Sequence, residues 1–174
     1  MDWREAVREE QEWRNGLYLG ADTPLAPEAR KAFTGLRWFP LDERFRIEGV
    51  PLRRHPSPIP GRLASTGDDA LEMLEVGALE FELLGARCRL FAYEPAPGEA
   101  DEPYLLVPFR DATTGKETYG AGRYLDLDPD PKDAYTLDFN RAYHPYCAYD
   151  EAWACTLPPP ENRLPVRIEA GERL

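Results

Sequence analysis

From about residue 44 onward, apolar and polar residues alternate in short runs, and most of these runs are bounded by glycine or proline. Alternation with a period of two is typical of a strand that buries one face and exposes the other. The chain also holds 13 glycines and 18 prolines, which favour frequent turns over long helices. The pattern therefore predicts a mainly β protein, an antiparallel β-barrel or sandwich of about eight or nine short strands.

The stretch 70–94 has the clearest alternation. Glycines at 77 and 85 divide it into three runs, which predicts a three-stranded meander. Opposite charges on neighbouring runs are expected to face each other on the solvent side of this meander, namely Glu80 and Glu82 against Arg87 and Arg89. Further strands are predicted at 104–110, 118–127, 134–140 and 165–170, whereas the prolines at 51, 56, 58 and 60 predict an extended loop and an edge strand.

One amphipathic helix is predicted at the N-terminus, over residues 2–14. Asp2 and Glu5 have the spacing of a capping box, and Asn15-Gly16 is a natural stop. Residues 15–43 are expected to form a connecting loop, with a short helical turn near 27–33 and an apolar plug of Phe33, Leu36, Trp38 and Phe39. Residues 1–174 then make a single domain, in which 44–174 is the β part and two polar loops span 111–123 and 138–164.

Charge and hydropathy exclude several classes of partner. The chain carries 21 basic and 32 acidic residues, a net charge of −11, which disfavours nucleic acids and anionic membranes. No run of 18 or more apolar residues is present, and the charged N-terminus lacks the apolar region of a signal peptide. We therefore expect a cytoplasmic protein whose partner is a small molecule, with no nucleic acid and no membrane.

Arg123 lies on the apolar face of the predicted strand 118–127, so its side chain is expected to be buried. A buried guanidinium requires a carboxylate or several carbonyl groups, and Asp111 and Asp138 are the candidates. One interpretation is a ligand pocket in which Arg123 binds an anion; the other is an internal ion pair that fixes the strand register. The acidic stretch 126–130 is interpreted as a solvated turn in preference to a metal-binding loop.

Three residues of types that bind zinc follow closely, with the spacing His144-x2-Cys147-x7-Cys155. Structural zinc needs four ligands, and a tighter cysteine pair is usual, so this set is incomplete. The same residues also allow a cysteine nucleophile with a histidine base, a Cys147–Cys155 disulfide, or buried free thiols. Free thiols or a disulfide are favoured, and His55 is taken as a surface residue. No cofactor is therefore expected, with zinc as the alternative.

Long blocks of the chain resemble the domain-of-unknown-function family 1684. The blocks are FRDATTGKETYGAGRYL (109–125), LDFNRAYHPYC (137–147), CTLPPPENRL (155–164) and IEAGE (168–172), with weaker likeness at 12–14 and 33–40. The resemblance implies that the matching polar residues share one site: Asp111, Tyr119, Arg123, Asp138, Asn140, Tyr143, Cys147, Cys155, Asn162 and Glu169. His144 stands where the family usually has asparagine, which argues against a zinc site common to the family.

Two functions follow from this set. The first is binding of a small polar, anionic ligand in a pocket around Arg123 and Asp138, lined by Asp111, Tyr119, Arg123, Asp138, Asn140, Tyr143 and Asn162. The alternative is a hydrolase-type enzyme using the same pocket, in which Asp138 or Glu169 is the general base and Arg123 stabilises negative charge. In that case Cys147 and Cys155 either hold a metal, with His144, or brace the loop. A domain that only binds another protein is a third possibility.

Overall fold

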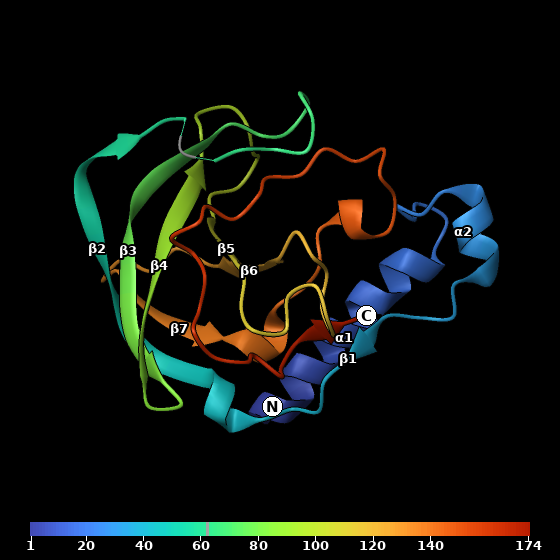
Figure 1. Cartoon of the computed structure of the whole chain (residues 1–174), viewed down its shortest axis with the longest axis horizontal. Helices are drawn as coiled ribbons and strands as arrows, with labels where there is room; N and C mark the ends of the chain where they lie inside the picture. Colours follow the sequence, from blue (N-terminus) through green and yellow to red (C-terminus); the bar gives the residue numbers. More distant parts are fainter. Residues whose placement is uncertain (62) are drawn as a thin grey trace.

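The computed structural model describes residues 1–61 and 63–174. Its main sheet has six antiparallel strands in the order β6-β5-β4-β3-β2-β7. These strands are β2 (Arg46–Ile59), β3 (Met73–Leu83), β4 (Ala86–Pro95), β5 (Leu105–Phe109), β6 (Arg123–Leu127) and β7 (Ala134–Asp138). The sheet curls into a half-barrel, so that its end strands β6 and β7 approach each other (Figure 1). A small second sheet pairs β1 (Arg37–Trp38) with β8 (Glu172–Arg173). The predicted mainly β fold class is confirmed.

The core fills the concave side of this half-barrel. Strand β5 is buried along its whole length because the curled sheet and the C-terminal segment enclose it. The buried apolar side chains of the core come from every strand of the main sheet, from the turn after β7 and from the C-terminal segment. They include Leu79, Leu90, Val107, Phe109, Leu125, Leu137, Phe139, Ile168 and Ala170. Burial of apolar area on this scale is the main source of folding free energy.

Strands β3 and β4 form a tight hairpin that confirms the predicted charge pairing. Its turn is Leu84-Gly85, and both residues have positive φ, as a two-residue hairpin turn requires. In the register of the two strands Glu80 lies opposite Arg89, and Glu82 lies opposite Arg87. The prediction of a third strand was wrong, because β3 runs through Gly77 without a turn. A Cβ at this position would lie 2.4 Å from the carbonyl oxygen of Arg53, so glycine permits close approach of β2.

Strand β2 contains three prolines and nevertheless lies inside the sheet, so the predicted edge strand was wrong. Its first half, Arg46 to Pro51, pairs with β7, and its second half, from Leu52 onward, pairs with β3. Each half therefore uses only one of its two edges for the backbone ladder. A proline, which has no N–H, is tolerated where its nitrogen faces the unused edge.

The N-terminal helix α1 (Trp3–Leu19) extends beyond the predicted end. Asp2 does begin it, and its backbone N–H donates to Glu5. The helix does not end at Asn15. The side chain of Asn15 does not cap the helix but accepts a hydrogen bond from the N–H of Leu36. Continuing the helix by one turn buries Tyr18. The short helix α2 (Pro27–Ala32) forms where a helical turn was predicted.

Short 3-10 turns and irregular segments complete the fold. The turns are η1 (Glu43–Phe45), η2 (Phe139–Arg141) and η3 (Tyr146–Ala148). Of the predicted plug, Phe39 is buried and the other three side chains are half-buried. Strand β6 is shorter than predicted and begins after Gly122, whose φ is +100°. The predicted strand at 165–170 is irregular, and β8 follows it at Glu172–Arg173. No helix within the described residues is long and apolar enough to cross a membrane.

Candidate functional site

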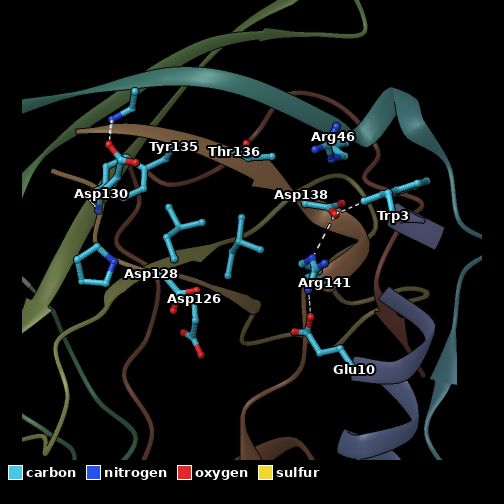
Figure 2. Close-up of a pocket in the computed structure, with 14 residues that line it drawn as sticks. Trp3, Glu10, Arg46, Asp126, Asp128, Asp130, Tyr135, Thr136, Asp138 and Arg141 are labelled. Carbon is cyan, nitrogen blue, oxygen red and sulfur yellow. Dashed lines mark hydrogen bonds and ion pairs between the residues drawn. The ribbon is translucent and has the colours of Figure 1, made fainter. Parts of the chain in front are cut away.

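A polar cleft of about 720 Å³ opens between the end strands β6 and β7 (Figure 2). The connection 128–133 joins the two strands, and no backbone ladder is recorded between them. The first turns of α1 form the opposite wall, through Trp3 and Glu10. The cleft is therefore the place where the curled sheet fails to close into a barrel.

Carboxylates dominate the lining of this cleft. Asp126, Asp128 and Asp130 come from the end of β6 and the loop after it, and Asp138 comes from the end of β7. Within residues 1–61 and 63–174, no lysine or arginine makes an ion pair with Asp126, Asp128 or Asp130. The three lie at intervals of two along the chain. These three carboxylates therefore have no direct ion-pair partner among the described residues, although Arg14 acts electrostatically on Asp126.

Asp126 is a carboxyl group of this cleft whose pKa is raised. Its carboxylate accepts a hydrogen bond from the Tyr143 hydroxyl at 2.7 Å. Crowding by surrounding protein atoms raises the pKa of Asp126, and the nearby Asp128 adds to the rise, while the Tyr143 hydrogen bond and Arg14 oppose it. Arg14 from α1 lies 3.8 Å over the Tyr143 ring and so fixes that ring beside β6. Asp126 is thus a carboxyl group suited to proton exchange or to binding a cation.

Asp138 lines the same cleft, but both of its carboxylate oxygens already accept hydrogen bonds from other residues of the protein. One oxygen accepts hydrogen bonds from the indole of Trp3 at 2.7 Å and from Nε of Arg141 at 3.3 Å. The other accepts from the backbone and the side chain of Asn140. Arg141 also pairs with Glu10 (Figure 2). Asp138 therefore ties the start of α1 to the end of β7 and builds the wall of the cleft.

Arg123 lies elsewhere, sealed inside the protein with a relative exposure of 1%. Its Nη1 donates to the carbonyls of Ala170 and Glu172, and its Nη2 donates to the carbonyl of Ile168 at 2.8 Å. Its carboxylate partner is Asp111, at 3.5 Å. The structure thus confirms the predicted burial and one of the two predicted partners. It does not bring Arg123 and Asp138 to a common pocket, because the C-terminal segment covers the guanidinium.

Asp111 and the two asparagines are equally engaged within the chain. Asp111 accepts hydrogen bonds from the N–H of Ile168 at 2.6 Å and from Thr113. Asn140 exchanges two hydrogen bonds with the backbone of Asp42. Asn162 donates to the carbonyls of Phe91 and Pro108 and accepts from the N–H of Phe91, and it is fully buried. These side chains act as connectors between segments far apart in the sequence.

The three candidate zinc ligands, His144, Cys147 and Cys155, do not form a metal site in the structure. His144 is buried, its Nε2 accepts from the N–H of Tyr119, and its Nδ1 lies 3.3 Å from Glu172. Both ring nitrogens are therefore occupied by the protein. Cys147 and Cys155 are free thiols. Within the described part of the chain, no group of three or more His, Cys, Asp or Glu side chains is arranged to hold a metal ion.

The remaining predicted residues divide between two places. Tyr119 donates through its hydroxyl to Cys147, so it belongs to the thiol region. Glu169 is half-exposed and pairs with Arg167 beside a second cleft near the C-terminus, away from Asp138. The sequence pattern predicts a solvated turn at Asp126 and Asp128; the structure leaves both exposed, places Asp126 on β6 and brings both to the cleft. Their spacing of two, continuing the outward face of a strand, was the available signal.

The fold and the cleft define a class: a curled antiparallel β half-barrel, closed by an N-terminal helix and an irregular C-terminal segment, with a polar cleft at its open seam. The chain belongs to the family described as protein of unknown function (DUF1684), whose model matches residues 31–173. It is also similar to the solution NMR structure of an uncharacterised protein from Haloarcula marismortui. The two are 37% identical, with a TM-score of 0.78, over 99% of this chain and 95% of that one. A search of curated proteins found no match.

Proposed function

We propose that this protein binds a small polar ligand in the cleft between β6 and β7. The observation that carries the proposal is the unpaired negative charge of Asp126 and Asp128 on one wall of a cleft large enough for a metabolite. The guanidinium that suggested an anionic ligand is covered by the C-terminal segment. The charge of the lining instead supports a ligand that carries an ammonium group or several hydroxyl groups. The free thiols fit a cytoplasmic location, where thiols stay reduced.

The test is a binding titration with ligands of both signs. Spermidine and glucosamine represent amines, glucose represents neutral sugars, and citrate represents anions. We expect an amine or sugar to shift the amide NMR signals of β7, and Asp128→Asn to weaken that binding about tenfold, because one charged contact is lost.

The matched control is Glu82→Gln, which removes the same charge on the far hairpin and should leave affinity unchanged. Binding of citrate alone would contradict the proposal and would restore the anionic ligand. The same conclusion would follow if Glu82→Gln weakened binding as much as Asp128→Asn.

A hydrolase-type reaction in the same cleft is the second candidate. It is favoured by Asp126, whose raised pKa and accessible position suit a general acid or base. The assay is release of nitrophenol from nitrophenyl esters and glycosides. Under this candidate Asp126→Asn abolishes turnover and retains folding, whereas turnover equal to that of the unmodified protein rules Asp126 out.

The pH dependence of stability tests the raised pKa of Asp126 directly. Because its pKa is higher in the folded than in the unfolded chain, the folded state binds this proton more tightly. The carboxyl therefore stabilises the fold most below its unfolded pKa, and this contribution is lost as pH rises through the folded pKa. Asp126→Asn should then gain stability relative to the unmodified protein between about pH 3 and about pH 7 in urea unfolding. A constant difference across that range would show an unperturbed carboxyl.

A further inference from the structure

We propose that the second cleft, near the C-terminus, binds a small organic anion that carries a carboxylate on an apolar body, and that Arg37 and Arg173 hold this carboxylate. The second cleft has a volume of about 770 Å³ and shares no lining residue with the cleft between β6 and β7. A volume of this size suits a metabolite. The proposal concerns a separate site and does not depend on the proposed function.

The second cleft lies between the segment that follows β1 and the C-terminal segment. Residues 39–45 form one wall, and Glu169 and Arg173 come from the C-terminal segment. The pairing of β8 with β1 holds the two segments together (Figure 1). The wall 39–45 contributes four apolar side chains to the lining, those of Phe39, Pro40, Leu41 and Phe45. The cleft therefore offers apolar surface as well as charged groups.

The acidic side chains of the second cleft already have partners. Each of the four in its lining forms an ion pair with an arginine, and the pairs are Asp42–Arg44, Glu43–Arg4, Glu117–Arg167 and Glu169–Arg167. Their negative charge is therefore compensated locally. This distinguishes them from Asp126 and Asp128 in the other cleft, which have no direct ion-pair partner among the described residues.

Arg173 is the arginine of this lining that forms no ion pair with an acidic side chain within residues 1–61 and 63–174. Its guanidinium lies 5.2 Å over the ring of Phe39. Its Nε donates to the backbone oxygen of Leu174 at 3.4 Å, and its two terminal nitrogens have no acceptor in the same residues. A guanidinium that stacks on a ring keeps N–H donors at its edge, where a carboxylate can accept two of them.

Arg37 brings a second positive charge to the same place. It lies opposite Arg173 in the register of β1 and β8, and both side chains are exposed. Like charges directly opposite each other on an antiparallel pair repel, because their Cβ atoms are only about 4.5–5.5 Å apart. Arg37 has no ion pair in the described part of the chain either, although the sequence holds 32 acidic and 21 basic residues. A carboxylate bound between the two guanidinium groups would remove their repulsion.

The site selects an anion that also has an apolar part. The two arginines provide donors and positive charge, and the wall 39–45 provides surface for an aliphatic chain or a ring. An inorganic anion would use only the arginines, and a charge contact at an exposed position contributes little. A neutral apolar molecule would use only the wall. Binding is therefore tightest when one molecule carries both parts.

Titration with 4-phenylbutyrate tests the proposal, with 4-phenylbutanol and inorganic phosphate as comparison probes. The alcohol has the same apolar body without the charge, and phosphate has charge without the body. We expect 4-phenylbutyrate to shift the amide NMR signals of residues 39–45 and 172–174, and to bind at least about tenfold more tightly than either comparison probe. The amide signals of β7, which report on the other cleft, should stay in place.

Two variants test the arginines. Arg173→Gln and Arg37→Gln should each weaken the binding of 4-phenylbutyrate about tenfold, because each removes one charged contact. Both positions are exposed, so both variants should fold, and melting curves without ligand check this. The matched control is Arg87→Gln, which removes the same charge from an exposed position on β4 and should leave the affinity unchanged.

Each of the opposite results would overturn the proposal. Unchanged amide signals of residues 39–45 in the presence of 4-phenylbutyrate would show that the second cleft does not bind such an anion. Equal affinity for 4-phenylbutanol would show that only the apolar wall matters, and equal affinity for phosphate would show that the wall contributes nothing. Equal weakening by Arg87→Gln would show that binding follows the net charge of the protein rather than Arg37 and Arg173.

Discussion

Replacing Arg123 by leucine should lower the free energy of unfolding by about 3–5 kcal/mol, as expected for breaking a buried ion pair. The change removes the donor to the carbonyls of Ile168 and Ala170 and leaves the buried carboxylate of Asp111 without its counter-charge. In a domain of this size the melting temperature should fall by about 10 °C or more. Urea unfolding and calorimetry measure both quantities.

The control for this prediction is Arg53→Leu. Arg53 is exposed on β2, and its only recorded ion pair among the described residues joins it to Glu80 at 3.7 Å. An exposed pair contributes about 0–1 kcal/mol, so this variant should melt close to the unmodified protein. If Arg123→Leu were equally stable, Arg123 would not be architectural, and its role as a ligand-binding residue would return.

Arg123 also illustrates how far sequence reasoning reaches. The period of two correctly predicted a buried guanidinium, and Asp111 was one of the two partners expected for it. What the pattern lacked was the identity of the other acceptors, which are backbone carbonyls of residues 168–172. Carbonyls are present in every residue and leave no mark in a sequence. A sequence therefore cannot distinguish an arginine that is free to bind an anion from one whose donors are already bound to backbone carbonyls of the same chain.

The strands show the same division. Pairs within one hairpin, such as Glu80 with Arg89, followed from alternation because the two runs are adjacent in the chain. The position of strand β2 inside the sheet did not follow from its sequence. Its prolines are tolerated because the strand changes its pairing partner from β7 to β3 along its length. Gly77 was read as a turn, and its actual role is to admit the carbonyl of Arg53. Such features depend on contacts between distant segments.

The polar residues that the family resemblance grouped into one site thus occupy several places in the fold. Asp111 with Arg123 holds the C-terminal segment, Asn140 holds the chain at Asp42, and Asp138 holds the start of α1. Each is buried and hydrogen-bonded, as a polar group in a core must be. The polar cleft lies beside Asp138 and is lined by Asp126 and Asp128, which make no direct ion pair among the described residues.

Asn162→Ala offers the sharpest test of this connector role, with an expected cost of about 2–4 kcal/mol. Strands β4 and β5 are paired in register at Tyr93 and Leu106, and Pro108 has no N–H to give. Beyond that point the side-chain amide of Asn162 joins the two strands. It accepts from the N–H of Phe91 and donates to the carbonyls of Phe91 and Pro108. Truncation removes the Asn162 partner of three backbone groups, of which the Pro108 carbonyl is buried and the two of Phe91 are partly buried.

The comparison variant is Asn15→Ala, which removes one hydrogen bond at a half-buried position, to the N–H of Leu36. It should cost about 1 kcal/mol, so Asn162→Ala should destabilise the protein at least twice as much. Hydrogen exchange adds a readout specific to the bridge, because the amide of Phe91 should lose protection while the amides of the β3–β4 turn keep theirs. Equal costs for the two variants, with Phe91 still protected, would mean that β4 and β5 hold together without Asn162 and that this buried amide serves another purpose.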